Sequence, residues 1–147
     1  MAKAVAINRS KVHESLVQSL SGENAIIYDE SGKKLFPTIR ELLTFAALLG
    51  LKHGKRTPIN KEHGIEDIQG TTYEDTEALE FIWMIAVIET GNAEILKDGN
   101  ERQCAIIFEE YSNTGLKIIS EYLDKIPHEE KIEKIIEKVS KIALLNK

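Results

Sequence analysis

The amino-acid sequence predicts an all-α protein: a compact bundle of five to six helices around two buried central helices, with at most one short N-terminal strand. Three observations support this prediction. Two segments, centred near Leu43 and Ile85, are apolar around nearly their whole circumference, which is typical of helices buried on all sides. A third segment near the C-terminus has a regular amphipathic pattern. Only three prolines and nine glycines interrupt the chain, so long stretches can be helical.

Length and composition indicate one domain over residues 1–147. A chain of 147 residues can bury roughly 70% of its unfolded surface, which is enough for a stable core. The single cysteine, Cys104, excludes an internal disulfide and a cysteine-based zinc site, and fits a reducing compartment. The longest apolar run, 81–88, is far shorter than the roughly 20 residues of a membrane span. We therefore expect a soluble, cytoplasmic protein without a membrane partner.

The N-terminal part is expected to hold one helix and a loop. Residues 1–8 form either a short strand or a disordered start. Ser10 is the expected cap of a helix whose apolar positions follow helical spacing, and Ser21-Gly22 ends it. The members of that apolar face are Val12, Leu16, Val17 and Leu20. The loop that follows contains the turn-like Asp29-Glu30-Ser31-Gly32.

The two central helices follow. Phe36-Pro37-Thr38 is expected to open the first, with Pro37 in its first turn, and Gly50 to end it. Residues 59–71 are expected to be irregular. Thr72 and Asp75 fit a capping box at the start of the second, over about 73–89.

The C-terminal part begins with one expected helical turn over 93–97 and a fourth helix from Glu101. We expect a break or kink at 112–115, because Ser, Asn, Thr and Gly are weak helix formers. The helix then continues to about Leu123. An amphipathic final helix over 128–147 is expected either to pack on the core or to pair with a second copy, giving a homodimer.

Charge is unevenly distributed along the chain. Residues 1–61 carry a net charge of +5, residues 62–110 of -11, and residues 111–147 of +1. The basic and acidic segments form either two faces of opposite potential or ion pairs that neutralise each other.

The basic turn that follows the first central helix is the candidate nucleic-acid site. Lys52, Lys55 and Arg56 lie among helix-breaking residues, and Gly54 allows a close approach of the backbone to a partner. Arginine can bind phosphate in a fork and lysine supplies a point charge, so this turn could contact a DNA backbone. The alternative is a solvated loop that pairs with the acidic segment, since isolated basic clusters are a nonspecific signal.

No catalytic residue, metal site or cofactor is predicted. Neighbours on a helix point about 100° apart, so Glu109 and Glu110 cannot converge on one atom. Either of the two could lie near Tyr111 and the basic turn, and a structural ion pair or a surface face is favoured over catalysis. Cys104 is expected to be a core residue. The four histidines lack the spacing of a helical metal pair; they are His13, His53, His63 and His128.

Three stretches carry a resemblance to a known family: 36–58, 85–91 and 107–116, the last containing Glu109-Glu110-Tyr111 and Gly115. In this order, over residues 9–123, the chain resembles the DNA phosphorothioation-associated (Dnd system-associated) protein 4 family. The final helix lies outside the resemblance. Ser112 and Thr114 depart from the expected alanine and glycine.

The resemblance implies a bacterial or archaeal accessory protein, encoded beside systems that place sulfur in the DNA backbone and restrict unmodified DNA. It does not imply an enzyme. The first hypothesis is therefore a non-catalytic subunit of a restriction or antiviral defence system that contacts DNA through the basic turn. The residues proposed for this contact are Lys52, Lys55 and Arg56, helped by Arg9, Lys11 and Arg40. The second is a protein–protein adaptor that holds a larger restriction component through the acidic segment and the last helix.

Overall fold

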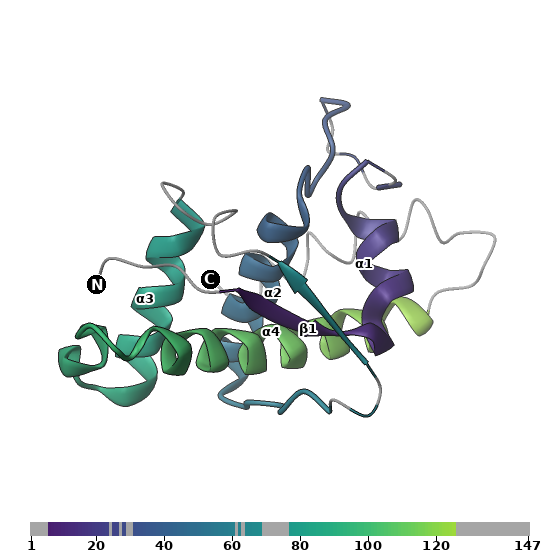
Figure 1. Cartoon of the computed structure of the whole chain (residues 1–147). Helices are drawn as coiled ribbons and strands as arrows, with labels where there is room; N and C mark the ends of the chain where they lie inside the picture. Colours follow the sequence, from purple (N-terminus) through teal and green to yellow (C-terminus); the bar gives the residue numbers. More distant parts are fainter. Residues whose placement is uncertain are drawn as a thin grey trace.

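The computed structural model describes residues 6–23, 25–26, 28, 31–60, 62, 64–68 and 77–125. This part of the chain is mostly helical, as predicted (Figure 1). The final helix expected over 128–147 and the capping box at Thr72 and Asp75 lie outside the described residues. The elements, in chain order, are β1 (Ile7–Ser10), η1 (Lys11–His13), α1 (Glu14–Leu20), α2 (Ile39–His53), β2 (Ile65–Ile68), α3 (Glu77–Thr90), η4 (Ala93–Leu96) and α4 (Glu101–Asp124).

α4 is the element on which the others pack. Figure 1 shows it running along the described part of the molecule, with α3 near one end, α1 near the other, and α2 and the strands between. α2 makes the most extensive contact with α4. The core between these elements is formed by fully buried side chains, among them Leu42, Leu43, Ile85, Phe108, Leu116 and Ile119.

The central pair of helices therefore differs from the predicted one. The sequence predicted that the helices near Leu43 and Ile85 are both buried all round and form the centre. α2 is largely buried, but its main partner is α4 rather than α3. α3 buries Ile82 and Ile85, whereas Met84 and Ile88 are 41% and 55% exposed. An apolar run alone did not distinguish a central helix from one whose second side faces outward.

The sequence allowed either a short strand or a disordered start over residues 1–8; a strand, β1, is present, but it runs on to Ser10 and does not stand alone. It pairs antiparallel with β2, in a register from Ile7 opposite Ile68 to Ser10 opposite Ile65. Residues 65–68 were predicted to be irregular. Four residues with Glu66 and Asp67 at their centre give too short an alternation for a strand to be recognised.

The caps of α2 are specified locally. Thr38 accepts a hydrogen bond from the Glu41 backbone N–H and Glu41 returns one to Thr38, a complete capping box. Pro37 precedes this cap instead of lying in the first helical turn. The helix ends at Gly54, whose left-handed φ of 69° suits glycine, so Gly50 does not end it.

Gly50 and Gly115 lie where α2 and α4 cross. A Cβ on Gly50 would lie 2.1 Å from the Tyr111 carbonyl oxygen, and a Cβ on Gly115 would lie 1.9 Å from that of Ala46. Both distances are far below van der Waals contact, so the two backbones approach this closely only because neither residue has a side chain.

The break predicted at 112–115 is wrong, because this stretch of α4 is where the two helices cross. α4 is continuous from Glu101 to Asp124. Ser112 donates to the Leu43 carbonyl at 3.0 Å and Thr114 to that of Glu110 at 3.1 Å. The small and polar residues of this stretch serve the helix crossing and do not interrupt the helix.

Replacing Gly115 by alanine is expected to destabilise the fold. Alanine improves intrinsic helix propensity by about 1 kcal/mol, but the clash with the Ala46 backbone forces the two helices apart. We expect a net loss of about 1–3 kcal/mol in the free energy of unfolding, measured by urea denaturation. Glu121→Ala, at an exposed position of the same helix, is the matched control and should change stability little. A Gly115→Ala protein as stable as the parent would contradict the close crossing.

Candidate nucleic-acid interface

The loop after α2 is fastened to the middle of α4. The Thr57 backbone N–H donates to the Glu110 carbonyl at 3.2 Å. The Asn113 side-chain amide donates to the carbonyls of Thr57 at 3.1 Å and Pro58 at 3.3 Å. The Thr57 and Thr114 hydroxyls lie 2.7 Å apart. The basic turn is thus held in place by the stretch of α4 that carries the family resemblance.

Arg56, predicted to contact DNA, is bound to two carboxylates of the acidic segment. Its Nε donates to Glu110 at 2.9 Å and its Nη1 to Glu89 at 3.2 Å. Tyr111 donates its hydroxyl to the same Glu89 oxygen at 2.9 Å. For this residue the ion-pair interpretation describes the structure, and of the two neighbouring glutamates Glu110 is the one that lies beside the basic turn.

The network shifts the ionisation of its members. Burial lowers the pKa of Arg56, but hydrogen bonds and charge from Glu110 and Glu89 outweigh burial and raise it above the ordinary value. Burial and then the hydrogen bond to Glu89 raise the pKa of Tyr111. Arg56 stays charged and Tyr111 stays a donor at neutral pH, so the cluster is a stable ion-pair network and not a reactive one.

Glu109 faces a different partner. It is 4% exposed and accepts two hydrogen bonds from Arg102, at 3.0 and 3.1 Å. It also accepts from the Asn8 backbone N–H at 2.7 Å, which ties β1 to α4. Glu109 and Glu110 therefore do not converge, as expected from their spacing, and each has a structural role.

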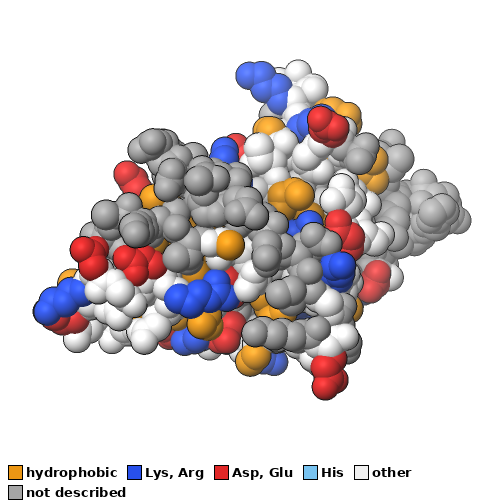
Figure 2. Space-filling model, in the orientation of Figure 1, with side chains coloured by type: hydrophobic (Ala, Val, Ile, Leu, Met, Phe, Trp, Pro, Cys, Tyr) orange, Lys and Arg blue, Asp and Glu red, His pale blue; other side chains and the backbone are white. Residues whose placement is uncertain are grey.

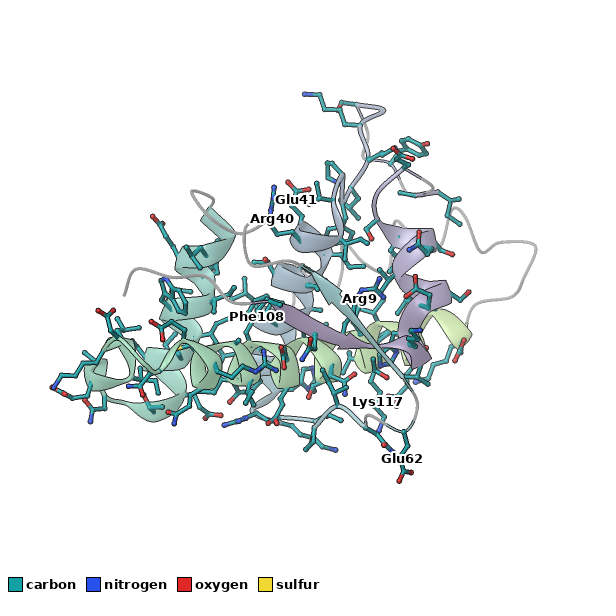
Figure 3. The ribbon with its side chains drawn as sticks, viewed as in Figure 1. Arg9, Arg40, Glu41, Glu62, Phe108 and Lys117 are labelled. Atoms are coloured by element: carbon teal, nitrogen blue, oxygen red, sulfur yellow. The ribbon has the colours of Figure 1, made fainter. Side chains whose placement is uncertain are left out.

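The three further basic residues predicted to help bind DNA do not all lie beside the basic turn. Arg9 is 7% exposed and forms an ion pair with Glu14. Lys11 is exposed, and part of its side chain lies against Gly64. Arg40 lies in the first turn of α2, at the opposite end of that helix from the turn, and Figure 3 shows it well away from Lys117.

Lys52 and Lys55 are exposed, and neither forms an ion pair with a described residue. Lys117 of α4 joins them. It lines a cavity of about 250 Å³ together with Lys55, His53 and the carboxylate-bearing Glu121, and Figure 3 shows it on the side of α4 toward the loop that carries Glu62. The sequence analysis missed Lys117, because 62 positions separate it from Lys55 and only the fastening of the loop brings the two together.

The face seen in Figure 2 does not divide into a basic and an acidic field. On it, the Lys and Arg side chains of the described residues lie interspersed with Asp and Glu. The opposite charges of the two sequence segments are at least partly matched within the fold, as for Arg56.

The described residues give little support for a reactive cysteine or a metal site. Cys104 is fully buried, and burial raises the pKa of its thiol, which disfavours the reactive thiolate. Within the described residues no cluster of side chains has the composition of a metal site. In the same part of the chain, no helix has the length and apolar character needed to cross a membrane.

Arg56 is expected to matter for stability. Arg56→Gln leaves Glu89 and Glu110 close together without their cation, so we expect a loss of about 1–2 kcal/mol in the free energy of unfolding, between the values for surface and for buried ion pairs. The measurement is urea denaturation at neutral pH. Arg56→Lys, which keeps the charge but not the fork, should lose less. Equal stability of the Arg56→Gln protein and the parent would show that the network contributes nothing.

Comparison with known proteins gives one match. The family model described as DNA sulphur modification system-associated protein 4 matches residues 6–143. The match extends beyond the resemblance at 9–123 and includes most of the C-terminal segment, which the sequence analysis had placed outside it. No curated protein and no solved structure matches the chain. Because the family model covers nearly the whole chain, the protein belongs to the DNA sulphur modification system-associated protein 4 family.

Proposed function

We propose that this chain is a non-catalytic accessory subunit of a prokaryotic DNA sulphur modification system linked to restriction, and that it contacts the DNA backbone through Lys52, Lys55 and Lys117. Family membership supports the association with such a system. The contact itself is supported by one observation: Lys52, Lys55 and Lys117 are exposed and form no ion pairs with described residues, and Lys55 and Lys117 line one cavity beside a loop that α4 holds in place.

The different positions of the arginine and the lysines favour this proposal. Arg56 uses its planar fork to bind two carboxylates of the fold. The lysines keep their charge at the surface, where a compact ammonium group can bind a phosphate oxygen. Arg56 is therefore an anchor of the loop in this proposal, and Arg9, buried with Glu14, is not a DNA contact.

The test is binding of the full-length chain to a DNA duplex at several salt concentrations. We expect affinity to fall as salt rises, and each lysine-to-alanine change at 52, 55 or 117 to reduce the slope of log affinity against log salt by about 1. Lys97→Ala removes an exposed lysine that directly follows η4 and pairs with Glu94, and is the matched control. No binding at low salt, or binding that salt does not affect, would refute the DNA contact.

A protein–protein adaptor is the second candidate, and α3 provides an observation in its favour. Met84 and Ile88 lie one helical turn apart and are 41% and 55% exposed, within the acidic segment 62–110. A pair of exposed large apolar side chains on one helix face is typical of a docking surface. The proposed partner is another protein of the same modification system.

Docking can be tested by co-expression with the other proteins of the system. Met84→Glu combined with Ile88→Glu should abolish co-purification of the partner, because it places two charges in an apolar contact. Glu80→Gln, at an exposed position of the same helix, is the control. If the double variant still retains the partner, α3 is not the docking face.

A further inference from the structure

A second pocket adjoins the cavity that holds the lysines. It has a volume of about 340 Å³ and is bordered by Val12, His13, Pro58 and Asn113. It shares Thr57 and Lys117 with the basic cavity. Its wall is largely apolar, and Val12 is 63% exposed there although it is a large hydrophobic residue. An apolar pocket thus opens beside a group of lysines.

Asn113 contributes an unsatisfied acceptor to this pocket. The residue is 8% exposed, and both N–H groups of its amide are directed to the carbonyls of Thr57 and Pro58. These two carbonyls fix the orientation of the amide, since the reverse orientation would place oxygen against oxygen. Its Oδ1 has no hydrogen-bond partner among the described residues. A buried acceptor in this state is unfavourable until a donor reaches it.

Thr57 offers a second acceptor. Thr114 donates its hydroxyl proton to the Glu110 carbonyl, so the proton between the two threonine hydroxyls comes from Thr57. The Thr57 hydroxyl oxygen then keeps acceptor capacity at the boundary shared by both pockets. The wall of this pocket therefore includes two hydrogen-bond acceptors, whereas the adjoining cavity presents Lys55 and Lys117 together with the carboxylate of Glu121.

His13 borders the same amide. The side chains of His13 and Asn113 interact, and this interaction raises the His13 pKa, but burial lowers the pKa by more, so the ring is neutral at neutral pH. Among the described residues, no donor lies within hydrogen-bond geometry of the Asn113 Oδ1. The charged residues around the ring are Lys11 and Glu14 in the adjoining turns, and Lys117 and Asp124 on α4.

We propose that the two pockets together bind one unpaired nucleotide of a DNA strand, with the base between Val12 and Asn113 and its phosphate on Lys55 and Lys117. A nucleobase is flat and largely apolar on its faces, and carries N–H donors on its edge. It is joined to a phosphate that needs cations. A free phosphate would not use the apolar pocket, and an apolar ligand would not use the lysines.

The size of the pocket suits a single base. Its volume of about 340 Å³ lies at the lower end of the range for small-molecule sites, which begins at about 300 Å³. In a duplex the base must leave the stack to enter such a pocket, which costs least where it is already unpaired. This inference rests on the proposed DNA contact and adds the class of substrate: a single-stranded or extruded nucleotide.

The experiment compares three probes on the full-length chain at one low salt concentration: a single strand of twelve nucleotides, the corresponding duplex, and a strand of the same length made of abasic sites. The backbone charge of the two single strands is the same, so their affinity ratio reports the base alone. We expect the base-bearing strand to bind about fivefold more tightly than the abasic one, as for one additional hydrogen bond, and more tightly than the duplex.

Two variants place the effect in the pocket. Val12→Glu puts a carboxylate at the pocket and should reduce the ratio of the two affinities to about one. Ile88→Glu adds the same charge at an equally exposed apolar position on α3 and should leave the ratio unchanged. Lys117→Ala should weaken both strands. Because Val12 and Ile88 are both exposed, neither substitution disturbs the core.

Each other outcome overturns a defined part of the proposal. Equal binding of base-bearing and abasic strands removes the base pocket and leaves the backbone contact intact. If the ratio of the affinities for the base-bearing and abasic strands is unchanged by Val12→Glu, the base binds elsewhere. If deoxynucleoside monophosphate alone binds with the affinity of the strand, the site serves a free nucleotide and the DNA version is wrong. No binding of any strand or duplex refutes the proposed function and this inference together.

Discussion

The close crossing of α2 and α4 is the constraint on which the rest of the structure depends. Gly50 and Gly115 leave no side chain between the two backbones, so carbonyl oxygens of one helix lie where a Cβ of the other would be. This proximity brings the end of α2 onto the middle of α4. The loop that follows can then hydrogen-bond to Glu110 and Asn113, and Lys55 can line one cavity with Lys117.

Within this frame, charge is used in two different ways. Arg56 is surrounded by Glu89, Glu110 and Tyr111, and its fork holds the loop, α3 and α4 together. The lysines at 52, 55 and 117 remain exposed. A guanidinium can satisfy two carboxylates at once in a partly buried place, whereas an ammonium group is strongly hydrated and favours the surface. The same basic segment therefore supplies both a structural anchor and the exposed cations.

Sequence patterns correctly predicted the features that depend on residues close together in the chain. The mostly helical class and the helical turn at 93–96 follow from spacing and composition, whereas spacing did not decide which of Glu109 and Glu110 lies beside the basic turn. The break at 112–115 was wrong, because propensity ranks Ser112 and Gly115 as weak helix formers while their partners on α2, Leu43 and Ala46, are distant in sequence. Lys117 was missed for the same reason: no spacing rule connects it to a loop some sixty residues earlier.

The buried polar residues 112–114 of α4 take part both in the helix crossing and in the proposed binding site. A helix can bury Ser112, Asn113 and Thr114 only if their hydrogen bonds are made, and each of them donates to a carbonyl. The exception is an acceptor, the Oδ1 of Asn113. This atom belongs to the wall of a pocket that Lys117 also lines, whereas the other buried unpaired atom of the described residues, the Nε of Arg9, lies outside this stretch. Such departures are expected at functional sites rather than in ordinary packing, so the unmatched acceptor links the helix crossing to the proposed binding surface.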